Sequence, residues 1–331
     1  MLSPAACGSL EAALERAVTR FDDGSPTSAQ IRYHFGFGEP SRRGKRLRSR
    51  LVLEVCAEEG GVDEDALDAA CAIEIVHEFS LIHDDIEDGD RLRRGRETLW
   101  SRFGLAHGIN AGDALCAVAY LSLLDGSAPR PAERTVAMTR VLQEAHLAMC
   151  AGQGRDIAFE TEARVTMDDY RAMIGGKTAA LFAAACELGA LSAGTTERRA
   201  AAYGTLGRAY GIAFQIEDDL LGTWGDSATT GKPSGADLAK RKWVFPVVWA
   251  LAGPPSAARD RVASAYAGGT ELDARTVAAT IDALDRLGAR EAALRAVRTA
   301  LADADAIADR EAIDRSGRVR AFFGGAVRRI A

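Results

Sequence analysis

The sequence predicts an all-α fold that forms a single domain over residues 1–331. Segments rich in Ala, Leu, Arg and Glu recur along the chain, with apolar residues three or four positions apart. This spacing is typical of amphipathic helices, whereas the alternating runs that indicate strands are almost missing. The breaks at Pro129–Pro131 and Gly253–Pro255 are interpreted as interhelical loops, because the helical pattern resumes directly after each of them.

Helical periodicity, together with the residues that start or stop helices, gives the elements in order. Asp63 is expected to cap the N-terminus of a long helix and Gly89 to follow its end. Gly222 and Gly225 are expected to end a second long helix in the same way. With ends accurate to about two to four residues, the expected helices cover residues 9–21, 27–36, 45–58, 63–88, 109–124, 132–158, 168–173, 177–193, 197–222, 237–252, 257–266, 273–287, 290–309 and 317–329.

The composition is that of a globular protein and excludes several classes. Hydrophobic residues make up 47% of the chain and charged residues 27%, and the net charge of −6 argues against extended nucleic-acid binding. The longest apolar stretch, near residues 114–124, is shorter than the ~20 residues of a membrane span, and no secretory signal is evident. The cysteines lie far apart, as is typical of reduced thiols. We therefore expect a soluble, cytoplasmic protein.

The pentapeptide at residues 84–88, Asp-Asp-Ile-Glu-Asp, is the first indication of chemistry. Asp84 and Asp88 lie one turn apart on one face of a helix, and Asp85 lies on the flank of that face. Their carboxylates can converge on one or two ions, and oxygen ligands suit magnesium. An acidic helix end is more often simply solvated, but here several arginines follow at once. They are Arg91, Arg93, Arg94 and Arg96, and arginine binds phosphate groups through two parallel hydrogen bonds.

A second acidic pair, Asp218 and Asp219, repeats this combination of charges. Basic residues gather in three further segments, at residues 42–48, 231–232 and 240–242. The Gly-Lys-Thr sequence at residues 176–178 is no P-loop, because the first glycine and the preceding strand of that motif are missing. Nucleotide binding is therefore rejected. Magnesium held between protein carboxylates and a diphosphate is the hypothesis that accounts for both signs of charge.

The ordered set of motifs resembles the trans-isoprenyl diphosphate synthases of the polyprenyl synthetase family. The resemblance covers roughly residues 40–250, and the set is specific although each piece alone is not. It implies a helical bundle around a central cavity, of the isoprenoid synthase type, and usually a homodimer. In the family's order, the motifs are Gly44-Lys45-Arg46-Leu47-Arg48, His77 before Ser80-Leu81-Ile82-His83-Asp84-Asp85, Arg93-Arg94-Gly95, Gly152-Gln153-Gly154-Arg155-Asp156, Gly176-Lys177-Thr178, Phe214-Gln215 with Asp218-Asp219, and Gly231-Lys232.

By this resemblance, separate sets of basic residues would hold two diphosphates. That of isopentenyl diphosphate would be bound by Lys45, Arg48, His77 and Arg94, and that of the allylic substrate by Arg93, Lys177, Lys232 and Lys242. Magnesium, three ions per active site, would link the allylic diphosphate to Asp84, Asp88 and Asp218. Thr178 and Gln215 would lie along the allylic chain. Asp85 and Asp219 would support the clusters, whether or not they touch metal. The expected catalytic residues are Asp84, Asp85, Asp88, Arg93, Lys177, Asp218 and Asp219.

The implied reaction needs no protein nucleophile. Magnesium and cationic side chains would stabilise the charge that grows on the departing diphosphate. The double bond of isopentenyl diphosphate would attack the resulting allylic cation, and the released diphosphate would accept the proton that is lost. An apolar pocket would keep water away from the cation.

The chain departs from the family pattern at three places. Gly222 stands where the last Asp of a second Asp-Asp-x-x-Asp motif is expected, and Asp226 lies another turn on, beyond the expected helix end. Ser49 stands where the family often has Pro, and residues 240–244 replace the usual Gly-Lys-x-Thr pattern. These changes bear on metal affinity and rate more than on the type of reaction.

Residues that precede the first acidic cluster on its helix are expected to set the product length. Phe79 is five residues before Asp84, about 7 Å along the helix axis. A bulky Phe79 followed by the small Ser80 most resembles geranylgeranyl diphosphate synthases. Farnesyl diphosphate and somewhat longer products stay open, and an ordinary core aromatic is the alternative reading of Phe79.

Two other functions compete with this one. A terpene cyclase also uses magnesium-binding carboxylates, but it has no use for the second diphosphate set at residues 45, 48, 77 and 94. A non-catalytic partner subunit would be consistent with Gly222. The active prenyltransferase is the preferred hypothesis, with no nucleic-acid partner and no stable membrane insertion.

Overall fold

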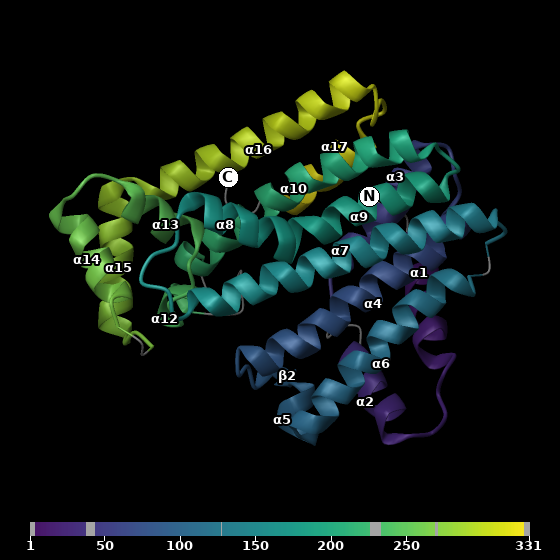
Figure 1. Cartoon of the computed structure of the whole chain (residues 1–331), viewed down its shortest axis with the longest axis horizontal. Coiled ribbons are helices and arrows are strands. Elements are labelled where there is room, and N and C mark those ends of the chain that lie inside the picture. Colours follow the sequence, from purple (N-terminus) through teal and green to yellow (C-terminus); the bar gives the residue numbers. More distant parts are fainter. Residues whose placement is uncertain (1–3, 38–43, 127, 226–232, 269–270, 328–331) are drawn as a thin grey trace. The chain divides into compact units, whose positions relative to one another are not determined.

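The structure is a computed structural model of the chain (Figure 1), and it describes residues 4–37, 44–126, 128–225, 233–268 and 271–327. The predicted all-α fold is confirmed, since the strands found among these residues are two segments of two residues each. In chain order, the first elements are α1 (Pro4–Thr19), α2 (Pro26–Phe35), α3 (Leu47–Glu58), α4 (Asp63–Glu87), β1 (Leu92–Arg93), β2 (Arg96–Glu97), α5 (Leu99–Phe103), α6 (Leu105–Leu124) and α7 (Ala132–Phe159).

The second half of the chain continues the helical pattern and contains one π-helical turn. Its elements are α8 (Met167–Ile174), the π-helical turn η2 (Gly175–Ala179), α9 (Ala180–Ser192), α10 (Glu197–Trp224), α12 (Ala236–Ala239), α13 (Phe245–Ala252), α14 (Ala257–Tyr266), α15 (Ala274–Leu287), α16 (Ala289–Glu311) and α17 (Arg318–Val327).

The chain divides into two compact units, and each is described by itself. Unit 1 comprises Met1–His146, Ala184–Gly204 and Glu311–Phe322, and unit 2 comprises Leu147–Ala183, Thr205–Arg310 and Phe323–Ala331. That these units belong to a single domain stays a prediction. The first acidic cluster lies in unit 1 and the second in unit 2, so each half of the candidate site has its own scaffold.

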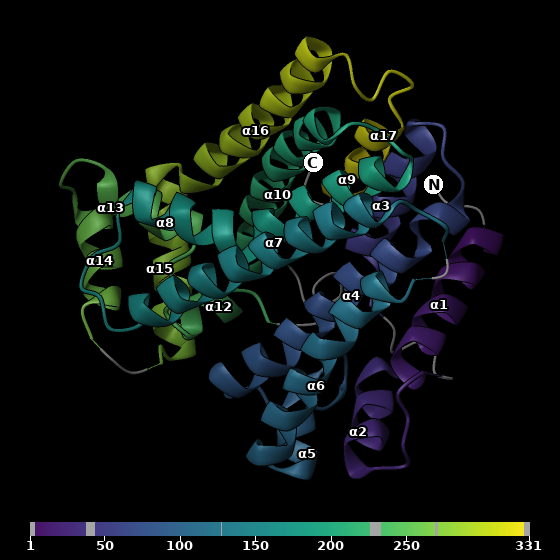
Figure 2. The same cartoon turned by 45° about the vertical axis from the view of Figure 1, so that its right-hand side comes forward.

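Unit 1 is organised around α4, which packs against α1, α3, α5 and α6. Figure 2 shows α4 and α6 side by side, with α1 and α2 next to them. Their close approach depends on Gly108 and Gly112 of α6. A Cβ at Gly108 would lie 2.9 Å from Ile86 Cδ1, and one at Gly112 would overlap the His83 ring. These glycines lower the intrinsic helix propensity of the segment, which is why the sequence predicted the helix only from residue 109.

A short β-hairpin follows α4 and was missed by the sequence analysis. Leu92 pairs with Glu97 and Arg93 with Arg96. The two turn residues both have positive φ, 52° for Arg94 and 74° for Gly95, as two-residue hairpin turns require. A non-glycine residue in this conformation is uncommon, so the Arg-Gly pair gave little warning of a hairpin.

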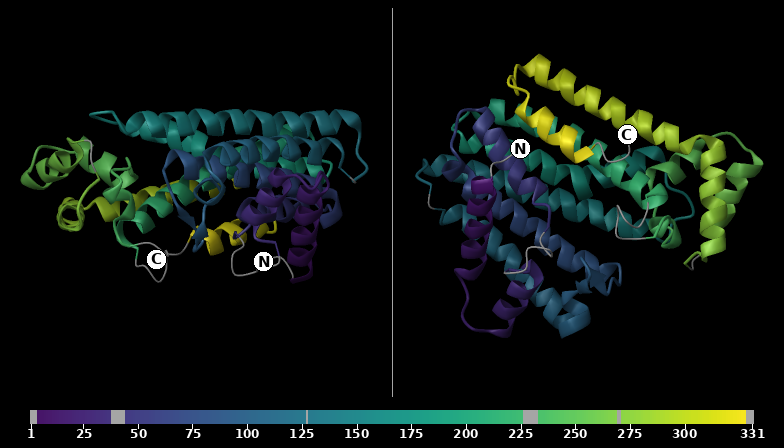
Figure 3. Two further views of the ribbon diagram at one scale, coloured as in Figure 1. Left: turned by 90° about the horizontal axis from the view of Figure 1, so that it is seen from below. Right: turned by 180° about the vertical axis from the view of Figure 1, so that it is seen from behind.

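In unit 2, α13 packs against α8, α14 and α15, and α12 packs against α15. Figure 3 shows α12, α13 and α14 in green and α15 in yellow-green. In the same unit, the backbone of α7 lies against the backbone of η2. A Cβ at Gly152 would overlap the Lys177 amide nitrogen and lie 2.7 Å from the carbonyl carbon of Gly176. Glycine at position 152 thereby allows η2 to approach α7.

Several expected boundaries were wrong. The N-cap of α4 is Val62, and Asp63 is the first helical residue. Gly222 lies inside α10, which continues to Trp224. The helix expected over 237–252 is two helices, α12 and α13, because Arg241 adopts a positive φ of 55° that breaks the helical path.

The continuous stretch Met167–Ser192, and not 114–124, is the most membrane-like segment found in the described part of the chain. Its length and composition would suffice to cross a membrane. However, 72% of its most apolar window is buried inside the protein, as is usual for a core helix.

Candidate active site

The first acidic cluster lies at the C-terminal end of α4, where Asp84 and Asp88 are both half-buried. Asp85 is 2% exposed and accepts hydrogen bonds from Arg93, at 2.8 Å from Nε and 2.7 Å from Nη2. Burial raises the pKa of Asp85, and the Arg93 guanidinium limits that rise. Asp85 therefore anchors the hairpin to α4, while Asp84 and Asp88 occupy the face that the sequence predicted for metal.

Next to this cluster, the buried carboxylate of Glu78 contacts basic side chains from three separate segments. Its Oε1 accepts from Arg46 Nη1 at 2.6 Å and from both Arg94 Nη atoms at 3.3 Å, and its Oε2 is 2.9 Å from His34 Nε2. Burial opposes ionisation, but the His34 hydrogen bond and the charge of Arg94 hold the pKa of Glu78 well below its usual range. Glu78 therefore stays charged and fixes Arg94 against α4.

The start of α3 carries the segment with the predicted ligands Lys45 and Arg48, and buried Arg46 fixes it in place. Burial disfavours the charge of Arg46, but the carboxylates of Glu74, Glu78 and Glu11 raise its pKa. Ser49 Oγ donates a hydrogen bond to Glu74 Oε2 at 2.9 Å, so the serine at the usual proline position joins this network. Lys45 is exposed and Arg48 half-buried.

His77 lies one residue before Glu78 on α4. Burial and then the charge of Arg48 hold the pKa of His77 well below its usual range, so its imidazole is neutral at pH 7. Gly44 lies close to both Arg94 and Glu78. A Cβ at this position would lie 2.8 Å from Arg94 Nη2 and 3.3 Å from Glu78 Oε1. Within unit 1, the structure thus brings Arg94 and the segment of Lys45 and Arg48 to one side of α4.

Phe79 is 8% exposed and packs edge-on against two histidine rings. The ring centroids are 4.8 Å from His83 and 5.0 Å from His146. Tyr120 stacks on His146, with a 2.7 Å hydrogen bond between its hydroxyl and Nδ1. Ser80 Oγ donates to the His77 carbonyl at 2.8 Å. Phe79 is therefore backed by an aromatic wall from α6 and α7.

In unit 2, the two aspartates of the second cluster have different environments. Asp218 is exposed, whereas Asp219 is 4% exposed. Asp219 Oδ2 accepts from the Tyr170 hydroxyl at 2.6 Å and from the Phe245 backbone amide at 2.7 Å, and Oδ1 accepts from Gln215 at 2.9 Å. Burial raises the pKa of Asp219 to about 7, and the charge of Asp237 adds to the rise. Asp219 is thus a structural anchor for α8, α10 and α13.

The π-helical turn η2 directs two predicted substrate ligands to different helices. Lys177 Nζ is 2.5 Å from Asp156 Oδ2 on α7, and Thr178 Oγ1 donates to Gln215 Oε1 on α10, also at 2.5 Å. Gln215 in turn donates to Asp219. Thr178 and Gln215 are therefore brought together, as expected for residues that share one part of a pocket.

Lys242 follows α12, and both its backbone amide and its backbone carbonyl form hydrogen bonds. Its amide donates to the Asp237 carbonyl and its carbonyl accepts from the Tyr266 hydroxyl, each at 2.9 Å. Lys232 and Asp226 lie outside the described residues.

The carboxylates of the two acidic clusters suit magnesium, which does not need a site built entirely from protein ligands. In the described part of the chain, no group of three or more His, Cys, Asp or Glu side chains could hold a metal by itself. Magnesium usually takes only one or two protein carboxylates and completes its octahedron with water and substrate phosphates. Asp84 and Asp88 in unit 1, and Asp218 in unit 2, can supply such carboxylates.

Sequence reasoning missed the residues that support the ligands. Glu78, Asp156 and Tyr170 fix Arg94, Lys177 and Asp219 respectively. Only Asp156 carried a signal, as part of the Gly-Gln-Gly-Arg-Asp motif. Glu78 stands between the singled-out His77 and Phe79, but a glutamate on a helix gives no hint of being fully buried.

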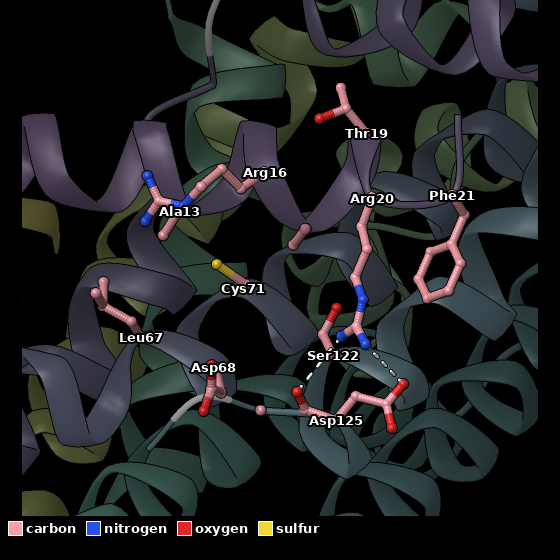
Figure 4. Close-up of a pocket in the computed structure, with 12 residues that line it drawn as sticks. Ala13, Arg16, Thr19, Arg20, Phe21, Leu67, Asp68, Cys71, Ser122 and Asp125 are labelled. Atoms are coloured by element: carbon pink, nitrogen blue, oxygen red, sulfur yellow. Dashed lines mark hydrogen bonds and ion pairs between the residues drawn. The ribbon is translucent and has the colours of Figure 1, made fainter. Parts of the chain in front are cut away.

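A separate pocket of unit 1 contains none of the predicted site residues. Its volume is about 400 Å³, and it lies between α1, α4 and the end of α6 (Figure 4). Arg20 spans it, with Nη2 3.3 Å from Asp125 Oδ2 and Nη1 3.4 Å from the Asp125 carbonyl. Arg20 and Asp125, two of the charged residues that line this pocket, are therefore paired with each other.

Comparison with known proteins agrees with the motif pattern. A family model described as polyprenyl synthetase matches residues 39–284. A geranylgeranyl diphosphate synthase of Mycobacterium tuberculosis is 42% identical over 256 residues, which cover 76% of this chain and 72% of that protein. A (2E,6E)-farnesyl diphosphate synthase of Mycobacterium bovis is also 42% identical, over 69% of this chain and 64% of that protein.

Solved structures share the fold over nearly the whole chain. A polyprenyl synthetase from Streptomyces coelicolor A3(2) superposes with a TM-score of 0.87 at 34% identity, covering 98% of this chain and 96% of that one. A geranylgeranyl pyrophosphate synthase from Corynebacterium glutamicum, complexed with isoprenyl diphosphate and magnesium, gives 0.84 at 25% identity and 98% coverage of both chains. With its ordered motifs and its helical fold, the chain belongs to the polyprenyl synthetase family of trans-prenyltransferases.

Proposed function

We propose that this protein condenses isopentenyl diphosphate with an allylic diphosphate in a magnesium-dependent reaction and releases an all-trans polyprenyl diphosphate of 20 carbons. The observation that carries the proposal is the group of basic residues that gathers beside α4 in unit 1. Glu78 holds Arg94 beside the segment of Lys45 and Arg48, with neutral His77 next to it. An enzyme that acts on a single diphosphate has no need for this second set of phosphate ligands.

The roles of the residues follow from their chemistry. Lys45, Arg48, His77 and Arg94 bind isopentenyl diphosphate and hold its double bond in place. Arg93, Lys177, Lys232 and Lys242 bind the allylic diphosphate, and they stabilise the charge that grows on it as the allylic C–O bond breaks. Asp84, Asp88 and Asp218 are the carboxylates that hold magnesium, of which we propose three ions per site.

Bound magnesium supplies Lewis-acid stabilisation of the leaving diphosphate. The new C–C bond forms between the allylic carbon and the terminal alkene carbon of isopentenyl diphosphate. The proton lost in restoring a double bond passes to the diphosphate that has left. Arg93 and Lys177 keep that diphosphate in position to accept it.

The 20-carbon product is proposed from the wall around Phe79. The Phe79 ring, backed by His146 and Tyr120, would form a floor that stops the growing chain. The names of similar proteins include both farnesyl and geranylgeranyl diphosphate synthases, so measurement of the product distinguishes these lengths.

We also propose a cytoplasmic homodimer. Apolar side chains on α6 support the dimer, since Leu105, Ile109 and Leu124 are 53%, 44% and 55% exposed. Contiguous apolar patches on a protein surface mark interaction sites, and Leu105 and Ile109 lie one turn apart on the same helix.

The test is an assay of the purified protein with magnesium, isopentenyl diphosphate and each of the 5-, 10- and 15-carbon allylic primers. We expect consumption of isopentenyl diphosphate and a 20-carbon alcohol after dephosphorylation, detected by chromatography. Hydrocarbon release from an allylic diphosphate alone would instead favour a terpene cyclase. A folded protein that consumes no isopentenyl diphosphate would favour a non-catalytic partner subunit.

A further inference from the structure

The arginine run after the first acidic cluster contains a member whose role the proposed function does not explain. Arg93 and Arg94 are assigned to the two diphosphates, whereas Arg96 of β2 contacts α2. Its guanidinium carbon lies 4.3 Å from the centre of the Tyr33 ring, and its Nη2 donates to the His34 carbonyl at 3.0 Å. Arg96 therefore joins the hairpin to α2.

Tyr33 is half-buried on α2 and contacts both β2 and α5. Its hydroxyl donates a hydrogen bond to the Glu97 carbonyl of β2 at 2.9 Å. The guanidinium carbon of Arg102 on α5 lies 4.6 Å from the centre of the ring, and Phe103 packs edge-on at 5.4 Å between ring centroids. Tyr33 therefore contacts β2 through both its ring and its hydroxyl, while α5 packs on the same ring.

The position of β2 bears on the turn that carries Arg94. Arg93 pairs with Arg96 across the hairpin, and Arg94 and Gly95 form the turn between them. The first strand is held by α4, because Asp85 accepts two hydrogen bonds from the Arg93 side chain. The second strand is held by α2. The turn between the strands is therefore supported by two helices.

Helix α2 also reaches Arg94 by a second route, through Glu78. His34 Nε2 is 2.9 Å from Glu78 Oε2, while Glu78 Oε1 accepts from both Nη atoms of Arg94 at 3.3 Å. Because Tyr33 and His34 are neighbours, one turn of α2 contacts both the strand next to Arg94 and the carboxylate that binds it. This helix precedes residues 39–284, which match the family model. The support for Arg94 therefore comes in part from outside the matched segment.

We propose that Tyr33 is a positioning residue for isopentenyl diphosphate. Through Arg96 it holds β2, and thereby the turn on which Arg94 binds that diphosphate. This inference rests on the proposed function and deepens it. It predicts a selective effect, because Arg93, the ligand assigned to the allylic diphosphate, is held by Asp85 of α4. Loss of the Tyr33 contacts should therefore weaken the use of isopentenyl diphosphate more than the use of the allylic diphosphate.

Steady-state kinetics of the full-length protein with magnesium tests this inference, with the two substrates varied in turn. Tyr33→Leu keeps an apolar side chain on α2 but removes the ring and the hydroxyl. We expect the KM for isopentenyl diphosphate to rise about 10-fold. A loss of binding alone should leave kcat and the KM for the allylic diphosphate within about 2-fold of wild type. Tyr33→Phe keeps the ring against Arg96 and loses one hydrogen bond, so its KM for isopentenyl diphosphate should rise only about 3-fold.

Further variants show whether Tyr33 acts by the proposed route. Arg96→Gln removes the guanidinium from the Tyr33 ring and is expected to raise the same KM by about 10-fold. Because Arg96 lies in a half-exposed hairpin, this variant carries the test even if Tyr33→Leu does not fold. In Arg94→Gln the side chain that Tyr33 helps to place is missing, so adding Tyr33→Leu should change the KM by less than about 2-fold. Arg102→Gln is the matched control, since it removes the guanidinium that α5 places on the same ring, and the wild-type KM is expected.

Three results would overturn the inference while an active wild type still supports the proposed function. The first is an unchanged KM for isopentenyl diphosphate in both Tyr33→Leu and Arg96→Gln. The second is an equal loss in kcat and in both KM values, which would mean that Tyr33 only stabilises the fold. The third is an additive effect of Tyr33→Leu in the Arg94→Gln protein. A wild type that consumes no isopentenyl diphosphate would overturn both the inference and the proposed function.

Discussion

Glu78 is a single buried carboxylate that positions several basic side chains of unit 1. A buried carboxylate carries a desolvation cost of several kcal/mol, which is offset only when its partners are close and well oriented. Arg46, Arg94 and His34 provide these partners. Both Nη atoms of Arg94 contact Glu78 Oε1. The direction of the guanidinium is therefore fixed before any diphosphate binds. Such preorganisation lowers the entropic cost of binding an anion.

His77 gives a prediction on the pH dependence of stability. Its folded-state pKa is depressed, so below the unfolded pKa of ~6.5 the unfolded chain binds a proton that the folded chain does not. The stability associated with neutral His77 is therefore fully present above about pH 6.5 and is lost as the pH falls. We expect His77→Gln to reduce the loss by up to about 1.4 kcal/mol per pH unit, measured by urea unfolding between about pH 7.5 and about pH 5. Equal slopes for both proteins would contradict this.

Phe79 gives a prediction on product length. In Phe79→Ala the ring no longer stands between the growing chain and the His146 wall, so products longer than those of the wild type are expected. Chromatography of the dephosphorylated products measures the distribution. Ser80→Ala is the control, because it leaves a small side chain next to the same ring and is expected to keep the wild-type length. An unchanged distribution in Phe79→Ala would exclude Phe79 as the floor.

At the scale of elements, the contact between α7 and η2 is set by the absence of side chains. In Gly152→Ala the added Cβ would overlap the backbone of Lys177. A flexible side chain could change its rotamer to relieve such an overlap, but the backbone can do so only if one of the two elements moves. We expect a loss of about 1–3 kcal/mol in the free energy of unfolding. We also expect weaker binding of the allylic diphosphate, because Lys177 is displaced.

The same helix offers a matched control for this prediction. Gly154 has no atom within 4 Å of its added Cβ, so Gly154→Ala is expected to stabilise the protein by about 0.5–1 kcal/mol through the higher helix propensity of alanine. Chemical denaturation compares the two variants. Equal effects of the two substitutions would show that the contact with η2 does not matter.

Element boundaries also show what the sequence can and cannot predict. The long amphipathic helices α4, α7, α10 and α16 were found because their apolar spacing dominates every other signal. The start of α6 was missed, because its glycines make a poor helix in isolation and a good one only against α4. The hairpin was missed because Arg94 adopts a positive φ that is uncommon for a residue other than glycine, and its side chain is held by Glu78 of another element, α4.

For the molecule as a whole, the order of motifs predicted the family and the all-α fold, and both are confirmed. The residues proposed to bind the ligands were named from those motifs, because charged groups near glycine-marked helix ends are local features. Their supports could not be named, because Glu78 and Tyr170 acquire their roles only when separate elements meet.

The state of assembly gives a prediction at this scale. If α6 forms the interface of a homodimer, Ile109→Asp places a charge among apolar side chains and is expected to give a monomer, measured by light scattering after size-exclusion chromatography. Val62→Asp is the control, since Val62 is 57% exposed and precedes α4, and this variant should keep the assembly of the wild type. A persistent dimer in Ile109→Asp would place the interface elsewhere.

The π-helical turn η2 has a consequence for how this chain can vary in length. A π-helical turn holds one residue more than an α-helical turn, so it takes up a register shift of about 100° between α8 and α9. Lys177 can thereby face Asp156 on α7 while the next residue, Thr178, faces Gln215 on α10. Deletion of a single residue within 175–179 would restore a regular helix, and Lys177 and Thr178 could no longer both reach these partners. A change in the number of residues within 175–179 should therefore break at least one of these two contacts.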